Sequence, residues 1–483
     1  MRRATSPNRR ASQAHRGAEG GRASTDHGTG RPDGRRQATE APKPTEVAKP
    51  TEAPKPTAAA AATAKPAGPG GGFDWTKFKG DTINVEMSTS PRSDMFKKYQ
   101  KEFEDLTGIK VNLEITPEQQ ARQKQVIQFQ AGATDFDVTF VSWHVQKRLF
   151  GKNKWTVDLK PWVSDPTKTP ADFDFADIGK AGVDYATQAD GRMDTMPMTI
   201  DLWMVYWNKE LFDKAGLKYP TTHDEMYQAA KKLTDPASKT YGFIARGLKN
   251  ANVPVWTQLL LGYDIDPIDR KTGKLNTDGP EAIDAAKLYQ KLLRECAPPT
   301  VAGYNWNECQ TSFMQGGIGM WLDGIGFSAP LSDATKSKVV GKVGFGVTPK
   351  GPKAQHSAIF GDGAGVSSYS KKKEQAYLYI LWATNKANQV RLLLEAGSNP
   401  VRVSAFKDPK VTAPGAFQPG FLDCVSQSSA IGRPGLPEII PVTEFRDTIG
   451  IALTNMIGGA DPATELKKAT ETFKPILDKS EQG

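Results

Sequence analysis

The stretch MPMTIDLWMVYWNKELFDKAGLKYPTTHDEMYQAAKKLT, residues 196–234, combines a strand-like segment with a strongly helical one. The first part is almost entirely apolar, as in a strand inside a packed sheet, yet it contains Asp201 and, two positions later, Trp203. In the second part Thr222 begins a capping box, which predicts a helix at 223–234. A carboxylate in a buried strand needs a partner or an opening, because an unpaired buried charge is costly.

Upstream of this stretch, strands and helices alternate. Residues 81–89 alternate apolar and polar side chains as a strand does, and 93–108 place their aromatic residues on one helical face. A second alternating strand follows at 109–116, a helix at 118–133 and a buried strand at 136–143. This β-α-β-α-β order predicts an α/β sheet with helices on both faces.

Helices also account for much of the second half of the chain. Apolar periodicity predicts helices at 281–296, 374–397 and 463–479. With 483 residues, the chain exceeds the size at which a single hydrophobic core is usual. We therefore expect two or more domains or lobes.

The positive charge is concentrated at the N-terminus. The formal net charge is +9, but residues 1–72 hold 13 Lys/Arg and 6 Asp/Glu, which leaves 50 and 48 for the other 411 residues. A nearly neutral folded part does not indicate a groove for phosphates, so we expect no nucleic-acid partner.

Residues 1–72 have the composition of a disordered tail and proline-rich linker. They are rich in Arg, Ala, Pro, Gly and Thr, and TEAPKPTEVAKPTEAPKP at 39–56 repeats with a period of six residues. Such a segment cannot bury enough apolar surface to fold, and its prolines favour an extended spacer of roughly 50–60 Å. A spacer of this kind suits a protein that is held away from a surface.

An export signal is not visible in this sequence. Residues 1–38 contain arginine pairs but no apolar stretch, and the tail has no cysteine for lipid attachment. Membrane association would therefore depend on a lipid anchor that this sequence does not contain. We still expect an extracytoplasmic protein, at the cell surface or in the periplasm, whose true start and signal lie upstream of the assigned start.

The three cysteines, Cys296, Cys309 and Cys424, leave the redox state open. The first two enclose CAPPTVAGYNWNEC, and a disulfide across this loop fits the spacing as well as two reduced thiols do. Trp306 lies inside the loop and is expected to pack there. Because no zinc-type spacing of cysteine and histidine occurs, we expect no metal site and no cofactor.

Common catalytic motifs are absent from the chain. It has no G-x-S-x-G, no Walker A motif and no H-E-x-x-H, and its glycine-rich stretches do not match G-x-G-x-x-G. We therefore expect a protein that is not an enzyme. Paired carboxylates for glycoside hydrolysis meet in space and not in sequence, so a carbohydrate hydrolase stays an alternative.

Six motifs, in order, resemble those of the family 1 extracellular solute-binding proteins of ABC importers, the maltose-binding-protein group. The resemblance runs from about residue 80 to the C-terminus. The motifs are FKKYQKEFEDLTGIKVNLEI (96–115), FQAGATDFDVTFVSWH (129–144), VYWNKELFDKAGLKYPTTHDEMYQAAKKLT (205–234), FMQGGIGMWLDG (313–324), GSNPVRVSAF (397–406) and PATELKKATETFKPIL (462–477). Trp207 departs from the family pattern, which has Tyr or a similar residue there.

The resemblance implies a two-lobe periplasmic-binding-protein fold, with a ligand cleft between the lobes and a hinge that closes on the ligand. Lobe 1 would comprise 80–197 and 362–400, and lobe 2 would comprise 198–361 and 401–483. It implies an extracytoplasmic subunit that captures a sugar or polyol and delivers it to the transmembrane permease of an ABC importer. A polyamine-binding relative is a further alternative.

A sugar or polyol ligand explains the carboxylate in the opening stretch. Such a ligand presents apolar C–H faces, which aromatic rings cover, and hydroxyls, which charged groups bind. Asp201 lies just past a lobe crossing, where the family often has a ligand-binding carboxylate, and Trp203 lies on the same face of the strand. We predict that both contact the ligand, against the alternative that Asp201 only caps or solvates a hinge strand.

Three further candidates are Trp143, His144 and Trp256. Trp143 ends the predicted strand at 136–143, and the ends of such strands feed the ligand crevice of an α/β sheet. We therefore predict that it stacks on the ligand, against the alternative that it packs in the core. His144 follows it and is either a hydrogen-bonding partner or a surface histidine. Trp256 is predicted either to stack on the ligand or to pack in a helix.

The remaining candidates are polar or lie in turns. Trp321 and Asp323 stand in GMWLDG, whose glycines permit a close approach of ligand to backbone. Asp362 lies at the second proposed lobe crossing, and Arg402 offers a rigid guanidinium fork. Ser88 ends the first strand and offers a hydroxyl. The alternatives are a turn role for Asp323 and a surface ion pair for Arg402.

Overall fold

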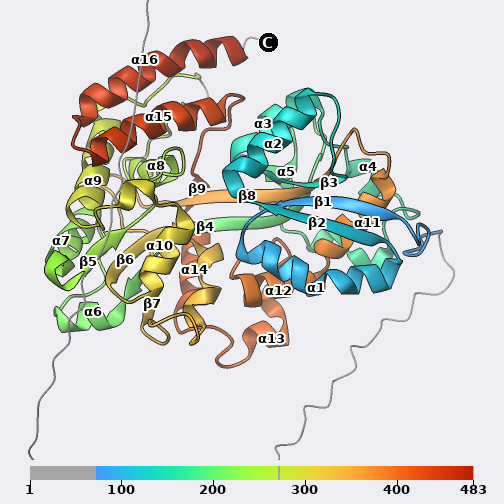
Figure 1. Cartoon of the computed structure of the whole chain (residues 1–483), viewed down its shortest axis with the longest axis horizontal. Helices are drawn as coiled ribbons and strands as arrows, with labels where there is room; N and C mark the ends of the chain where they lie inside the picture. The colour runs from blue at the N-terminus through green and yellow to red at the C-terminus, as the bar shows by residue number, and fades with distance from the viewer. Residues whose placement is uncertain (1–71, 270–271, 482–483) are drawn as a thin grey trace, which may run out of the picture. The chain divides into compact units, whose positions relative to one another are not determined.

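A nine-stranded sheet organises the part of the chain that the structure describes (Figure 1). The structure, a computed structural model, describes residues 72–269 and 272–481. The strands follow the order β2-β1-β3-β8-β4-β6-β5, with β7 paired to β4 and β9 paired to β8. Their bounds are β1 Thr82–Ser88, β2 Lys110–Thr116, β3 Val138–Ser142, β4 Met196–Asn208, β5 Tyr241–Ile244, β6 Ile318–Gly324, β7 Val343–Val347, β8 Ser357–Val366 and β9 Gly432–Pro434.

Strand β4 belongs to both halves of the sheet. Residues 196–202 pair antiparallel with β8, whereas 203–208 pair antiparallel with β6 and β7. The register against β8 shifts between Pro197 and Thr199, as is common for a proline, which cannot donate to the ladder. Figure 1 shows β4 and β8 side by side through the middle of the sheet. Asp201 therefore lies where β4 changes partners.

Sixteen α-helices and seven short 3₁₀ helices surround the described sheet. Figure 1 shows α2 and α3 on one side of β1 and β3, and α1 and α12 on the other. The helices are α1 Pro91–Thr107, α2 Glu118–Gln130, α3 Trp143–Asn153, α4 Lys160–Val163, α5 Lys180–Ala186, α6 Lys209–Lys214, α7 His223–Leu233, α8 Val253–Leu261, α9 Pro280–Glu295, α10 Trp306–Met314, α11 Lys373–Ala383, α12 Lys386–Ala396, α13 Pro409–Thr412, α14 Phe421–Ala430, α15 Val442–Ile457, α16 Pro462–Glu481, η1 Ala171–Phe173, η2 Phe175–Asp177, η3 Pro236–Ser238, η4 Val301–Gly303, η5 Ile325–Phe327, η6 Ala329–Ser332 and η7 Val403–Lys407.

Local sequence signals explain both ends of α1. The Ser90 hydroxyl accepts a hydrogen bond from the Ser93 backbone N–H, and the Ser93 hydroxyl accepts one from the Ser90 N–H, which forms a capping box. Pro91 occupies the first helical position, where its missing N–H costs nothing. Gly108 ends the helix with φ of 71°, a left-handed conformation that glycine adopts without strain. The β1–α1 connection is therefore held in a defined shape.

Two hydrophobic clusters form the core. One gathers buried residues mainly from 83–198 and 364–401, and the other mainly from 202–360 and 405–477. All of them belong to one compact unit of the chain. The two clusters occupy nearly the same parts of the chain as the two predicted lobes. The exact lobe boundaries stay a prediction.

Some predicted elements differ from the observed ones in their ends. The helix predicted at 374–397 is two helices, because Asn385 caps a new start with its side chain. The capping box at Thr222 is half formed: its hydroxyl accepts from Glu225 N–H, but the Glu225 carboxylate binds Thr221. Trp143 does not end β3 but begins α3, which turns its ring back into the core.

The three cysteines are free and buried, so the disulfide that the spacing allowed is not formed. Cys296 ends α9 and Cys309 lies within α10, each inside the same hydrophobic cluster. Burial raises the pKa of the Cys296 and Cys424 thiols to about 11. A thiol in such surroundings is protonated and unreactive at neutral pH.

The predicted disordered tail and linker lie outside the described residues, except for residue 72. Within the described residues, no helix is both long enough and apolar enough to cross a membrane.

Because all three cysteines are free and buried, the number of thiols that react with a labelling reagent should differ between the folded and the unfolded protein. Without reductant, Ellman's reagent should label no cysteine in the native state, because burial shields all three, and should label three after unfolding in guanidinium chloride. A sample treated with reductant before unfolding is the control and should give the same three. A single reactive thiol in the untreated, unfolded protein would show that Cys296 and Cys309 are joined.

Candidate ligand-binding site

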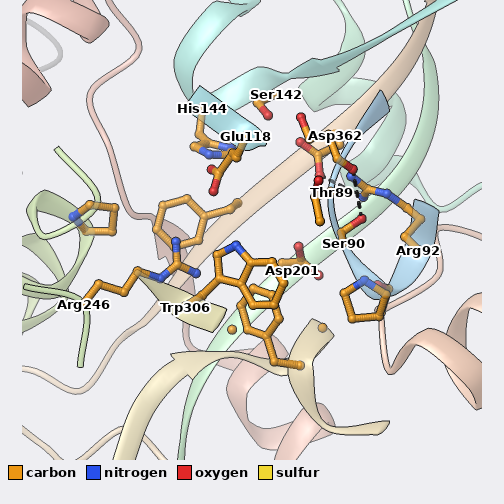
Figure 2. A pocket seen from close by; sticks show the side chains of 18 of the residues that line it. Thr89, Ser90, Arg92, Glu118, Ser142, His144, Asp201, Arg246, Trp306 and Asp362 are labelled. Atoms are coloured by element: carbon orange, nitrogen blue, oxygen red, sulfur yellow. Dashed lines mark hydrogen bonds and ion pairs between the residues drawn. The ribbon is translucent and has the colours of Figure 1, made fainter. Parts of the chain in front are cut away.

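A cavity opens beyond the ends of the parallel strands β1, β2 and β3 (Figure 2). Ser88 and Ser90 reach it from the β1–α1 connection, Glu118 from the start of α2, and Ser142 and His144 from the β3–α3 junction. Ligands of open α/β sheets bind at this edge, because successive connections leave a crevice there.

The other walls come from distant parts of the chain. They come from β4, β6, η5, β8, α10 and α15, and from Arg246, which lies two residues after the end of β5. The lining residues from these segments include Asp201, Trp203, Arg246, Trp306, Gly324, Gly326, Phe327, Phe360, Asp362 and Arg446.

The cavity has a volume of about 110 Å³. One water molecule needs roughly 10–15 Å³ of such space, so the cavity has room for a small molecule. Gly326 contributes to its shape: a Cβ there would lie 3.3 Å from Asp201 Oδ1. The missing side chain lets the η5 backbone approach this carboxylate closely.

Asp362 and Arg92 form an ion pair at one end of the cavity. Arg92 Nη1 donates to Asp362 Oδ2 at 2.8 Å and to the Thr199 hydroxyl at 2.9 Å. Burial alone would raise the pKa of Asp362, but the charges of Arg92 and other neighbours outweigh it and lower the pKa. Asp362 is therefore a carboxylate whose position Arg92 fixes.

Asp201 differs from Asp362 because its carboxylate has no partner. Among the described residues, none donates a hydrogen bond or an ion pair to it, and its Oδ1 is fully buried. Burial, with a smaller contribution from Asp362, raises the pKa of Asp201 to about 6, although Arg92 and Arg246 act in the opposite direction. The cavity thus contains an acceptor that the protein leaves unsatisfied.

Asp323 lies behind the cavity and holds Arg246. The Nε of Arg246 donates to both carboxylate oxygens of Asp323, at 3.1 and 3.0 Å, and its Nη2 adds a further bond. The guanidinium also lies 5.5 Å from the ring centroids of Trp203 and Phe327. These contacts present Arg246 to the cavity in a fixed orientation.

A second ion pair joins Glu118 and Arg122 at 2.6 Å, and Arg122 also donates to the Ser142 hydroxyl at 3.0 Å. Burial acts to raise the pKa of Glu118, but the charges of Arg122, Arg246 and further neighbours lower it to about 2. Burial and the charge of Arg122 lower the pKa of His144 to about 3. His144 is therefore neutral at physiological pH.

Aromatic rings cover part of the cavity surface. Trp306 and Phe327 stack with centroids 4.7 Å apart and planes 8° apart. Phe360 lies 5.5 Å from Trp203 and 5.0 Å from the His144 ring. Rings of this kind next to charged groups suit a ligand with apolar faces and polar edges.

The structure brings together five of the ten residues that the sequence predicted for the site. Ser88, His144, Asp201, Trp203 and Asp362 all line the cavity. Asp201 and Trp203 share a face of β4, as the alternation of a strand requires. The ligand contacts predicted for these residues stay a prediction.

The other predicted residues do not line the cavity. Trp143 packs against β8, where a Cβ on Gly361 would meet its ring at 2.5 Å, and its Nε1 donates to the Thr195 hydroxyl. Trp256 is buried in α8 and donates to the Ala282 carbonyl at 3.1 Å. Trp143 therefore occupies a core position and not the stacking position that we expected. For Trp256, the helix-packing alternative is the one that the structure shows.

Trp321, Asp323 and Arg402 also lie away from the cavity surface. The Trp321 ring stacks on Tyr206 at 4.8 Å, and its Nε1 donates to Asp323 at 3.2 Å. Asp323 is fully buried and does not line the cavity, but it holds Arg246, which does. Arg402 is buried too, and it donates to three backbone carbonyls and to Asp177. Its guanidinium fork serves the fold and not the cavity.

Most of the charged lining was not predicted from the sequence. Neither the cavity arginines nor Glu118 were candidates, and Trp306 was expected to pack, whereas Trp306 lines the cavity. One signal was available: Arg92 and Glu118 follow the ends of strands, as Ser88 does, and the same argument applies to them. Arg246 and Arg446 carried no local signal.

Within the described residues, no cluster of three or more His, Cys, Asp or Glu side chains could hold a metal ion. The cavity instead combines carboxylates, guanidinium groups and aromatic rings. This combination can bind hydroxyls at its polar groups and C–H faces at its rings.

The sequence profile of the bacterial extracellular solute-binding proteins matches residues 89–390. The chain belongs to this family. The resemblance found in the sequence motifs is thereby confirmed, and the position of the cavity can be compared with binding proteins of known structure.

Solute-binding proteins of several bacteria are similar over most of the chain. An erythritol/L-threitol-binding protein of Mycolicibacterium smegmatis is 26% identical over 427 residues, 83% of this chain and 87% of the relative. The crystal structure of an ABC transporter solute-binding protein of Agrobacterium radiobacter K84 with ribitol has a TM-score of 0.76 at 28% identity, covering 82% of this chain and 99% of that one.

The fold is also that of a maltose-bound protein, MalE3 of T. maritima, with a TM-score of 0.73 at 23% identity over 82% of this chain and 100% of that one. The two-lobe periplasmic-binding-protein fold predicted from the sequence is confirmed.

Replacing Asp201 by asparagine should change how stability depends on pH. The pKa of about 6 in the folded state exceeds the value of roughly 3.9 expected in the unfolded chain. This carboxyl therefore stabilises the folded state below about pH 4, and that contribution is lost as the pH rises through 6. Asp201→Asn should raise the free energy of unfolding at pH 7 by up to about 3 kcal/mol and flatten its change between pH 4 and 7.

Urea unfolding of the unliganded protein at several pH values measures this effect. Asp105→Asn, at an exposed position on α1, is the matched control and should keep the wild-type pH dependence. If Asp201→Asn keeps that dependence as well, the Asp201 carboxyl is not strained by burial.

Proposed function

We propose that the protein is the solute-binding subunit of an ABC importer, and that it captures a sugar or polyol in this cavity. The observation that carries the proposal is the unpartnered Asp201 carboxylate, which lines the cavity together with the stacked rings of Trp306 and Phe327. A ligand hydroxyl would satisfy this acceptor, and a ligand C–H face would cover the rings.

Two relatives support the polyol class. The M. smegmatis relative is named for erythritol and L-threitol, and the A. radiobacter structure contains ribitol. All three are linear polyols, and the cavity volume of about 110 Å³ suits a ligand of that size. Membership of the family implies that the protein acts outside the cytoplasm. It also implies that the lobes close over the ligand and that the protein delivers the ligand to the transmembrane permease subunits.

The charge of the cavity disfavours the polyamine alternative. A polyamine carries several cations and needs several free carboxylates, but Glu118 and Asp362 are already paired with arginines, and among the described residues of the cavity only the carboxylate of Asp201 is free. The hydrolase alternative requires turnover. We propose binding without catalysis, so the protein should release no product from nitrophenyl glycosides at stoichiometric concentration.

A thermal-shift screen against alditols, monosaccharides and oligosaccharides should find a polyol or small sugar that raises the melting temperature, because it binds only the folded protein. Calorimetric titration with that ligand then tests the site. Asp201→Asn should weaken binding by roughly 10- to 150-fold, since it removes a charged acceptor. Trp306→Ala should weaken it by about tenfold through loss of ring contact.

Asp105→Asn and Trp75→Ala are the matched controls. Trp75 packs edge-on against Phe73, and neither residue lines the cavity. Both controls should bind as the wild type does. Wild-type affinity in the two cavity variants would place the binding site elsewhere, and stabilisation by spermidine but by no sugar or polyol would overturn the ligand class.

A further inference from the structure

Arg446 is a buried cavity residue without a charge partner. It lies on α15, is 4% exposed and lines the cavity. Its Nε donates to the Asn250 carbonyl at 3.1 Å, and no described carboxylate forms an ion pair with its guanidinium. The neighbouring Asp447 pairs instead with Lys249 at 3.4 Å.

The other cavity arginines differ from Arg446 in this respect. Arg92 pairs with Asp362 at 2.8 Å, Arg122 pairs with Glu118 at 2.6 Å, and Arg246 is held by Asp323. A guanidinium that is removed from water without a counter-charge is costly, so its presence in a cavity wall needs a reason.

Charges at this end of the cavity do not balance. Three guanidinium groups, those of Arg122, Arg246 and Arg446, interact electrostatically with Glu118. Glu118 and Asp323 form ion pairs with two of them, and His144 is neutral, so the guanidinium of Arg446 is the one that has no described ion-pair partner. Burial, followed by the charge of Arg122, lowers the pKa of Arg446 to about 9.

Two helix N-termini reinforce the positive potential. Helices α2 and α3 begin at this end, and neither has a side-chain hydrogen bond at its N-cap. Their first backbone N–H groups carry the positive end of the helix dipole. Figure 2 shows Glu118, His144 and Arg246 on one side of the cavity, and Arg92, Asp362 and Ser90 on the other. The cavity therefore has one end whose positive potential favours an anion and another end whose polar groups can bind hydroxyls.

We propose that the ligand is an acidic polyol, an aldonate, whose carboxylate binds the Arg446 guanidinium and whose hydroxyl chain reaches Asp201 and Asp362. The proposal rests on the proposed function, because it assigns a class of polyol to the same cavity. A single carboxylate matches the single unpaired guanidinium. Its planar geometry also suits bidentate bonds from arginine.

The direct test compares ligands that share a carbon chain and differ only in the oxidation state of the first carbon. The pairs are D-gluconate with sorbitol, D-ribonate with ribitol, and L-threonate with L-threitol, titrated calorimetrically into the wild-type protein at pH 7. In the pair that binds, the aldonate should bind 10- to 150-fold tighter, as expected for a charge-assisted bond.

Other results separate this inference from the proposed function. An alditol that binds as tightly as its aldonate would overturn the acidic class and leave the polyol site intact. Ribitol 5-phosphate tests whether the ligand carries a phosphate instead of a carboxylate. If it binds more tightly than every aldonate, the carboxylate assignment is overturned. Failure of all six unphosphorylated compounds and of the sugar panel to bind would overturn both.

Variants at Arg446 test the assigned contact. Arg446→Gln should bring the ratio of aldonate to alditol affinity close to one, whereas Arg446→Lys, which keeps the charge, should retain part of the preference. Arg391→Gln, which removes a surface arginine paired with Glu102, is the matched control and should keep the wild-type ratio.

Stability gives a second readout at Arg446. Because an uncompensated buried charge is costly, Arg446→Gln should melt at the same temperature as the unliganded wild type or higher.

A preference for aldonate that survives in Arg446→Gln would overturn the proposal. If Arg446→Gln does not fold, Arg446→Lys is compared with an Arg122→Lys variant instead. The same ratio of aldonate affinity to alditol affinity in these two variants would overturn the proposal.

Discussion

The architecture depends on one shared strand, β4, whose two halves pair with different partners. Residues 196–202 lie against β8, and 203–208 lie between β6 and β7. Because side chains of a strand alternate between faces, this continuity fixes the placement of Asp201 and Trp203 relative to both halves of the sheet. The cavity forms where the partners change, and β8 contributes Asp362 to it from the neighbouring strand.

The cavity combines satisfied and unsatisfied charges. Arg92 with Asp362 and Arg246 with Asp323 are complete ion pairs that hold their side chains in place. Asp201 lacks a partner, and its raised pKa shows that the folded protein tolerates an unfavourable charge there. Binding sites commonly keep such groups at a cost in stability, because a ligand that satisfies them gains the corresponding free energy.

The sequence predicted the fold better than it predicted the site. Strand alternation and capping signals act locally, so the elements from β1 to β3 and α7 were found with errors mainly at their ends. Asp201 was found because a carboxylate is anomalous in an apolar strand. Trp143 was misplaced, and Trp256 was left undecided, because an indole ring looks the same in a core and in a cleft. Arg446 was missed because nothing within α15 indicates that it faces a cavity lined by β4.

A crystal structure of the protein with its tightest-binding polyol or sugar would show where the ligand binds. We expect electron density for the ligand in the cavity, with a ligand oxygen within hydrogen-bond distance of the Asp201 carboxylate and a C–H face against Trp306. Ligand density elsewhere, such as in the apolar groove lined by Phe345, Leu393 and Phe417, with the cavity holding only water, would contradict it.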